Sequence, residues 1–160
     1  MSQLNTEELM KVYHESNIVN GKRFFPDLSC EKQLLCAEDN FISYIRDDFF
    51  KTRGAFYVVR LQEGKYCAAL RMEPYKSGLL LEALETRPDM RRQGHAYCLM
   101  KEALAYASQL KCNVVYSHVH KRNIPSLRVH IKAGFHRVSE TAAYIDGTVT
   151  QNSCTLCFDF

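Results

Sequence analysis

The chain has 160 residues, of which 46% are hydrophobic and 24% charged, the ordinary balance of a globular protein. This length fits a single domain over residues 1–160, and the composition excludes a disordered chain, a collagen and a disulfide-rich miniprotein. The net charge of +3 is too small for the basic stripe that nucleic-acid binding needs. No apolar run approaches the ~20 residues of a membrane span, and the polar N-terminus is unlike a signal peptide. We therefore expect a cytoplasmic protein that binds neither nucleic acid nor membrane.

The first 50 residues have the apolar periodicity of two helices. The first begins near Asn5, with Glu8 as the acidic partner of a capping box, and buries Leu9, Val12 and Tyr13. Its pattern breaks between residues 21 and 27. Ser29 caps a second helix that runs to about residue 50. The apolar face of this second helix comprises Leu34, Leu35, Phe41, Ile42, Ile45 and Phe49.

From residue 54 onward, the pattern alternates between strands and helices. Alternating side chains predict strands over residues 55–61, 66–72, 79–86 and 113–120. An amphipathic helix follows Arg91, and a shorter helix begins at an Asn123 cap and stops at Gly134. Two final strands, 135–145 and 148–158, are joined by Asp146–Gly147, a strong hairpin signal. This order predicts a mixed α/β sheet with helices on both faces.

The segment between strand 79–86 and the next helix contains the residues best suited to bind a ligand. It reads Arg91-Arg92-Gln93-Gly94-His95-Ala96. A glycine at a helix start lets a ligand approach the backbone, and the free N–H groups and dipole of the first turn bind anions. Two arginines add forked cations that match phosphate oxygens. The segment predicts a site for a diphosphate-sized anion; a basic helix start without a ligand is the alternative.

Residues 91–96 resemble the acetyl-CoA signature of the GNAT superfamily of N-acetyltransferases, Gln/Arg-x-x-Gly-x-Gly/Ala. A second segment, in which Asn123 opens a short helix that Gly134–Phe135 closes, is similar to another motif of that family. The resemblance spans residues 55–160 and implies a GNAT-like fold, with a mixed, mostly antiparallel central sheet flanked by helices on both faces. It also implies that an acetyl group passes from acetyl-CoA to a primary amine of a small molecule or peptide by direct attack in a ternary complex.

The same resemblance implies a set of cofactor contacts. The acetyl group would lie where strands 79–86 and 113–120 splay apart, and the pantetheine arm and the pyrophosphate would lie along the backbone. The implied cofactor-binding residues are Leu84, Glu85 and Thr86 for pantetheine, Arg91, Arg92, Gln93, Gly94, His95 and Ala96 for the pyrophosphate, and Asn123 and Ser126 on the other side.

An amine must lose a proton to attack a thioester, and the resemblance implies a base on strand 79–86. Glu82 and Glu85 are three positions apart, so on a regular strand they face opposite sides. We favour Glu82 as the catalytic base, because Glu85 lies where the backbone turns to the cofactor. A bulge in this strand would reverse the choice.

His130 stands four positions before Gly134, where members of the family often have a tyrosine that protonates the leaving thiolate. An unperturbed imidazole is mostly neutral at about pH 8, whereas tyrosine still holds its proton. His130 therefore acts as the catalytic acid only if its pKa is raised. Tyr97, Tyr116 and Tyr144 are substitutes for it, and unassisted departure of the thiolate is a third possibility.

Two further patterns are similar to metal or redox sites. His118 and His120 share one face of a strand, without an evident third ligand. Cys154 and Cys157 form a Cys-x-x-Cys within a strand, where positions three apart face opposite sides. We therefore expect no metal, and we expect the 7 cysteines to be free thiols.

The identity of the amine acceptor stays open at this point. Glu and His side chains near the cleft would suit a cationic amine. The alternative function is a non-catalytic acetyl-CoA-binding sensor or scaffold. This alternative follows from His130, which stands where the family often has the catalytic tyrosine. The Thr/Val/Thr alternation of the final hairpin suits pairing across a homodimer interface, but the sequence does not decide the oligomeric state.

Overall fold

The computed structural model describes residues 4–160 and begins with three helices, α1 (Thr6–Val12), α2 (His14–Phe24) and α3 (Cys30–Asp47). The side chain of Asn5 accepts a hydrogen bond from the Glu8 amide at 3.1 Å, so the expected helix start is confirmed. The single helix expected from Asn5 is wrong, because the chain leaves the helical conformation at Tyr13 (ψ 14°). The buried Tyr13 hydroxyl donates to the Ala83 carbonyl at 2.7 Å, which fixes this turn against the sheet.

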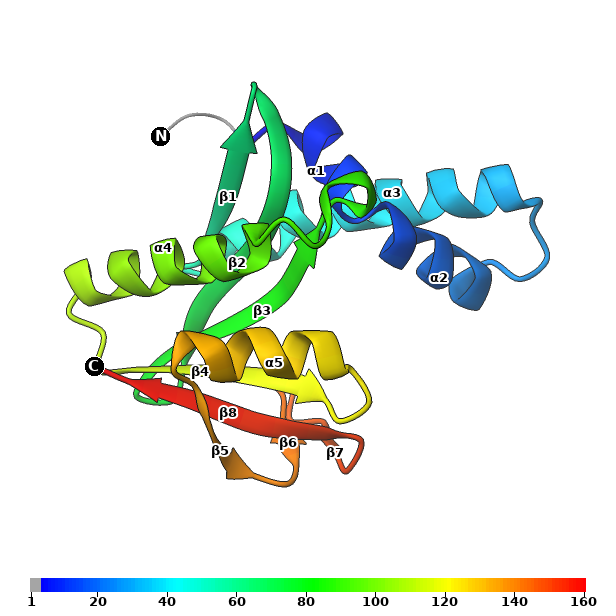
Figure 1. The fold of residues 1–160 in the computed structure, drawn as a ribbon. Helices are drawn as coiled ribbons and strands as arrows, with labels where there is room; N and C mark the ends of the chain where they lie inside the picture. Colours follow the sequence, from blue (N-terminus) through cyan, green and yellow to red (C-terminus); the bar gives the residue numbers. More distant parts are fainter. Residues whose placement is uncertain (1–3) are drawn as a thin grey trace.

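The third helix matches the second predicted helix, but its expected apolar face is partly wrong. Phe41, Ile42 and Ile45 pack against the sheet, whereas Leu35 is 55% exposed. Figure 1 shows the reason: α2 and the first half of α3 extend away from the sheet side by side. A short 3-10 turn, Phe49–Lys51, then leads into the first strand.

A six-stranded sheet forms the centre of the molecule, in the order β1-β2-β3-β4-β8-β5. All neighbouring strands are antiparallel except β3 and β4. The strands are β1 (Phe56–Gln62), β2 (Lys65–Tyr75), β3 (Gly78–Thr86), β4 (Val114–His120), β5 (His136–Ser139) and β8 (Ser153–Asp159). The predicted mixed α/β sheet is therefore confirmed.

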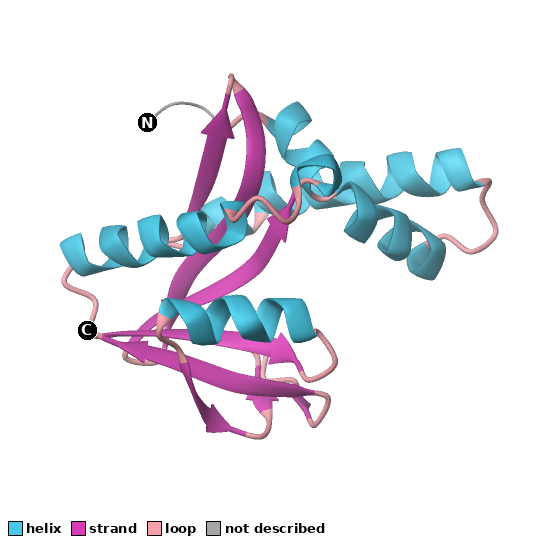
Figure 2. Cartoon of the chain, in the orientation of Figure 1, coloured by secondary structure: helices cyan, strands magenta, loops and turns pink. Residues whose placement is uncertain are grey.

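Helices cover both faces of this sheet, as expected. Helices α4 (His95–Gln109) and α5 (Ile124–Ala133) lie across one face, and they are in front in Figures 1 and 2. Leu99, Met100 and Leu104 of α4 are buried there against Leu81 and other apolar side chains of the strands. The opposite face packs against α1 and the end of α3 in a second apolar cluster. The apolar stripe of α4 is thus buried against the strands of the sheet.

The two final strands are shorter than the sequence predicts. Residues 135–145 divide into β5 and β6 (Ala142–Ala143), and residues 148–158 divide into β7 (Val149–Thr150) and β8. The turn at Asp146–Gly147 joins only β6 and β7, which form a separate two-stranded sheet. The divide lies at Thr141, whose backbone is held by Ser139 and by the Thr155 hydroxyl, which donates to its carbonyl at 2.7 Å.

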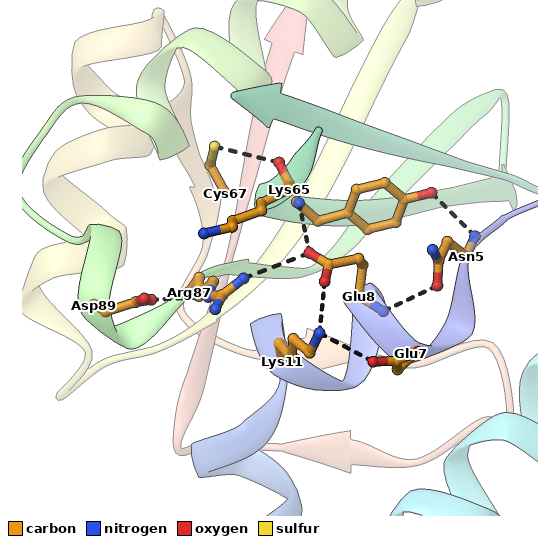
Figure 3. A network of polar contacts seen from close by, with 9 residues as sticks. Asn5, Glu7, Glu8, Lys11, Lys65, Cys67, Arg87 and Asp89 are labelled. Atoms are coloured by element: carbon orange, nitrogen blue, oxygen red, sulfur yellow. Dashed lines mark hydrogen bonds and ion pairs between the residues drawn. The ribbon is translucent and has the colours of Figure 1, made fainter. Parts of the chain in front are cut away.

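A polar network ties α1 to the sheet (Figure 3). The Glu8 carboxylate accepts from the Tyr66 amide at 3.1 Å and from Lys11 Nζ at 2.7 Å, and it pairs with Arg87 at 3.4 Å. The expected capping box is therefore only half formed, because the Asn5 amide donates to the Tyr66 hydroxyl instead of to Glu8. Glu8 joins α1 to β2 and to the segment that follows β3.

Within residues 4–160, no helix combines the length and the apolar character that crossing a membrane requires.

Candidate active site

A cavity of about 1310 Å³ opens where β3 and β4 diverge. These two strands pair in parallel only between Leu79–Leu81 and Val115–Ser117, and Figure 1 shows them separating beyond that point. The end of β3 therefore has a free backbone edge that faces the cavity. Of the residues predicted from the sequence, the cavity is lined by Glu82, Leu84, Glu85, Thr86, Arg91, Arg92, Gly94, His95, Ala96, Asn123, Ser126 and His130. Gln93 does not line it.

The loop before α4 presents unpaired amides to this cavity. Arg92 (φ 64°) and Gly94 (φ 86°) both adopt the left-handed conformation, which curls the backbone into an anion-binding nest. The first hydrogen bond of α4 runs from the Cys98 amide to the Gly94 carbonyl at 3.0 Å. In the part of the chain that the structure describes, no amide from Arg91 to Tyr97 donates a hydrogen bond. These donors fit an anion such as a pyrophosphate.

Basic side chains surround the same end of the cavity. Arg91 is held in place by Glu15 at 2.6 Å and by the Thr86 carbonyl at 3.3 Å. Arg92 forms no ion pair with any residue in the range 4–160, so its guanidinium is free for a ligand. Arg128 and Lys132 line the cavity from α5. This end of the cavity is therefore cationic.

His95, the first residue of α4, supplies a further unsatisfied group. It is only 8% exposed, and its Nε2 atom has no hydrogen-bond partner among the described residues. Leaving a buried polar atom unpaired costs about 1–3 kcal/mol. Because His95 also lines the cavity, a bound ligand would satisfy this nitrogen. The residues present thus fit a phosphate-bearing cofactor.

A bulge in β3 changes the predicted arrangement of the two glutamates. Arg71 of β2 lies opposite Glu82 and Ala69 lies opposite Glu85, so one residue of β2 faces both Ala83 and Leu84. Ala83 has φ 50°, the left-handed conformation that an inserted residue can adopt. The extra residue restores the alternation, so Glu82 and Glu85 lie on the same face of the sheet. The expectation that they face opposite sides is wrong.

The two carboxylates have different surroundings on that face. Glu82 forms an ion pair with Arg71 at 2.9 Å, and the Arg71 guanidinium lies 5.0 Å from the centre of the Tyr44 ring. Glu85 accepts a hydrogen bond from Ser16 of α2. Burial raises the pKa of Glu85 above its ordinary value, against the lowering effects of Ser16 and Arg91. Glu85 therefore binds a proton more readily than an exposed carboxylate does.

His130 is almost fully buried at 1% exposed, so it is not a surface residue of α5. Its Nδ1 atom lies 2.8 Å from the Ser126 carbonyl and must donate to it, which leaves Nε2 to accept from the Ser117 hydroxyl at 2.9 Å. Burial lowers the pKa of His130. The condition for an acid role, a raised pKa, is therefore not met. Asn123 caps α5 as expected, with its side chain accepting from the Ser126 amide at 3.2 Å.

A family model described as the acetyltransferase (GNAT) family matches residues 21–135. The chain belongs to the GNAT acetyltransferase family. Its fold is similar to that of the PaiA N-acetyltransferase of Thermoplasma acidophilum in complex with coenzyme A, with a TM-score of 0.67, 12% identity, and 99% of this chain and 96% of that chain covered. It is also similar to the ribosomal-protein-S18-alanine N-acetyltransferase of Escherichia coli, with a TM-score of 0.63, 17% identity, and coverage of 99% and 91%.

A GNAT family acetyltransferase from Elizabethkingia anophelis with acetyl-CoA bound is a third similar structure. It has a TM-score of 0.59 and 11% identity, and the match covers 72% of this chain and 82% of that one. No curated protein sequence is close enough to this chain to count as a relative. At these identities the structures establish a GNAT fold, and the acceptor must be argued from the site itself.

The GNAT match begins at Gly21, yet α2 contributes side chains before that residue to the cavity wall. The cavity is also lined by Glu15, Ser16, Val19 and Asn20, which were not predicted from the sequence. No local pattern marks these residues, because their role depends on α2 folding back beside β3. Ser117, which binds His130, was missed for the same reason.

Proposed function

We propose that the chain is an N-acetyltransferase that moves an acetyl group from acetyl-CoA to a primary amine. The proposal rests on two features of the cavity that lie where β3 and β4 separate. The unpaired amides of Arg91–Tyr97 form an anion cradle, and the half-buried carboxylate of Glu85 lies on the face covered by the N-terminal helices. One feature suits the cofactor and the other suits the deprotonation of an amine.

In this proposal, different residues of the chain bind different parts of the cofactor. The cradle at Arg92–Ala96 holds the pyrophosphate, and the free edge of Leu84–Thr86 pairs with the pantetheine arm. Asn123 and Ser126 contact the cofactor from α5. Arg128 and Lys132 meet a further phosphate at the basic end of the cavity. Acetyl-CoA supplies an activated acyl group in the form of a thioester.

Glu85 is the base in this proposal, and the bulge is the reason that it replaces Glu82. Free alkyl amines have a pKa near ~10 and carry a proton at neutral pH, so a base must take that proton. The amine nitrogen then bonds to the acetyl carbon, the carbon–sulfur bond breaks, and the electron pair leaves with sulfur. The Glu82 carboxylate already forms an ion pair with Arg71, whereas Glu85 has no such ion pair among the described residues.

The leaving sulfur takes its proton from a source other than His130, whose Nε2 atom accepts a hydrogen bond in the neutral ring. Tyr97 lines the cavity, whereas Tyr116 and Tyr144 do not, so Tyr97 is the side chain that we propose for this step. A thiol has a pKa of about 8.5, so a thiolate can also leave unaided and take a proton from water.

The acceptor in this proposal is a cationic amine of a small molecule or peptide. The part of the cavity wall formed by β3 contains the carboxylates of Glu82 and Glu85, whereas Glu15 pairs with Arg91 at the cofactor end, where Arg92 has no such partner among the described residues. An ammonium group is therefore attracted to the carboxylates, and the phosphates of the cofactor are attracted to the opposite end.

Two matched variants test the base. The purified protein is incubated with acetyl-CoA and a panel of diamines, amino acids and peptides with free N-termini, and the products are weighed by mass spectrometry. Glu85→Gln is expected to lower kcat about 100-fold or more, with little change in the KM for acetyl-CoA. Glu82→Gln is expected to lower kcat less than about tenfold. An unchanged kcat in Glu85→Gln would remove Glu85 from the mechanism.

A non-catalytic acetyl-CoA sensor is the second candidate, favoured by one observation: His130, at the position of the family's usual acid, is neutral and held by Ser117 and Ser126. A sensor binds acetyl-CoA but forms no acetylated product with any amine of the panel. In that case the rate of CoA release is equal in the wild type and in Glu85→Gln.

A further inference from the structure

A cluster of three metal-binding side chains lies at the edge of the sheet formed by β5 and β8. It comprises His136, Cys157 and Asp159. The Cys157 Sγ atom is 3.3 Å from His136 Nε2 and 3.6 Å from an Asp159 carboxylate oxygen, and that oxygen is 3.7 Å from His136 Nε2. The three atoms thus form a nearly equilateral triangle.

The sheet register explains how these residues meet. His136 of β5 lies directly opposite Cys157 of β8, so their side chains share one face. Asp159 is two positions after Cys157 and lies on the same face again. Cys154, the other half of the Cys-x-x-Cys, is on the opposite face in the core beneath α4 and α5. The ligands come from neighbouring strands, so the spacing along the chain does not reveal them.

The shape of the cluster favours a shared ligand over a catalytic relay. In a relay of thiol, imidazole and carboxylate, the two partners contact different nitrogens of the ring. Here both the thiol and the carboxylate approach the same atom, His136 Nε2. All three side chains therefore point toward one common position, which is the geometry of a metal site.

We propose that His136, Cys157 and Asp159 bind a zinc ion. Tetrahedral zinc has bonds of about 2.3 Å to sulfur and about 2.0–2.2 Å to nitrogen and oxygen, which implies separations between ligand atoms of roughly 3.3–3.6 Å. The observed separations of 3.3, 3.6 and 3.7 Å fit one face of this tetrahedron. A thiolate combined with an imidazole selects zinc over magnesium or calcium, which prefer oxygen.

The fourth position faces solvent and is taken by water. Cys157 is 5% exposed, while the side chains of His136 and Asp159 are 59% and 64% exposed. The proposed ion therefore lies between the buried Cys157 sulfur and the solvent. When it binds, the zinc–sulfur bond replaces the sulfur–hydrogen bond, and the proton passes to solvent.

The zinc site is separate from the acetyl-CoA cavity, because none of the three residues lines that cavity. It does not depend on the proposed function. Its effect is structural: the ion joins the edge strand β5 to β8. Because it binds only where both strands are folded, it stabilises the native state.

The test is a titration of the reduced full chain with cobalt, a spectroscopic substitute for zinc. The wild type is expected to bind one cobalt per chain, with a thiolate charge-transfer band in the near ultraviolet that zinc abolishes by competition. Cys157→Ser should remove the band, and His136→Gln and Asp159→Asn should each weaken zinc binding at least about tenfold. His136 and Asp159 are exposed, so these two variants keep the fold.

Cys30→Ser and His120→Gln are the matched controls, because both residues are exposed and lie outside the cluster. Both should bind cobalt as tightly as the wild type does. The proposal is overturned if the wild type shows no thiolate band, or if Cys157→Ser keeps it.

Discussion

The buried imidazole of His130 is a neutral hydrogen-bonding residue that links α5 to β4. Its two ring nitrogens are used by Ser126 of α5 and Ser117 of β4. The lowered pKa follows from burial, which disfavours the charged ring. At pH values below the ordinary pKa of 6.5, the unfolded chain binds a proton that the folded chain resists. His130 therefore makes the free energy of unfolding fall as the pH falls.

We predict that the free energy of unfolding of the wild type decreases as the pH falls from about 7.5 to about 5.5, and that His130 contributes to this decrease because burial lowers its pKa. In His130→Gln this decrease is smaller, because the titrating group is gone; half-buried His118, whose pKa burial also lowers, retains part of it. Urea unfolding followed by circular dichroism at several pH values measures the slope. His120→Gln, at an exposed residue of β4, should keep the wild-type slope, and an equal slope in His130→Gln would contradict the prediction.

Helix α1 is attached to the sheet mainly through the polar contacts of Glu8 (Figure 3). The Glu8 side chain is 14% exposed and binds β2 and Arg87, whereas the Glu7 side chain is 83% exposed and, among the described residues, pairs with Lys11 alone. The hydrogen bond from Lys11 lowers the pKa of Glu8, which shows that the folded state favours its charged form.

We predict that Glu8→Ala lowers the free energy of unfolding by about 1–3 kcal/mol, because the Tyr66 amide loses its acceptor and Arg87 keeps only its ion pair with Asp89. Glu7→Ala should change it by less than about 0.5 kcal/mol, as is usual for an exposed ion pair. Chemical denaturation of both variants at neutral pH gives the comparison. Equal losses in the two variants would show that Glu8 does not hold α1 to the sheet.

The elements that the sequence predicts correctly are those whose ends are set by residues a few positions away. Asn123 and Gly134 mark the ends of α5, and Gly94 marks the start of α4, because caps and left-handed residues depend on neighbours a few positions away. The bulge of β3 has no such mark, since the residue with positive φ is Ala83 and not a glycine. It follows from pairing with β2, and it changes which glutamate we propose as the base.

In the whole molecule, segments that are far apart in the sequence together form the cavity. Its walls come from α2, β3, α4, β4 and α5, which span residues 15–132. The half that we propose for the cofactor lies around one loop, Arg91–Ala96, whose glycine and arginines stand together in the sequence. The acceptor half depends on Ser16 of α2 meeting Glu85 of β3, a contact across 69 positions in the chain. No pattern of residues within one segment predicts that contact.

We propose that the Arg91–Ala96 loop binds acetyl-CoA, and isothermal titration calorimetry measures this binding. Gly94→Asp adds a negative charge to the anion cradle at a residue with φ 86°. Gly64→Asp is its matched control: the φ of 76° is similar, and at both glycines an added Cβ meets no atom of residues 4–160 within 4 Å, but Gly64 does not line the cavity.

We predict micromolar binding of acetyl-CoA to the wild type and to Gly64→Asp, and binding at least about tenfold weaker in Gly94→Asp, a loss of about 1.4 kcal/mol or more. An absence of binding to the folded wild type, or equal affinities in the two variants, would contradict the assignment of this loop to the cofactor.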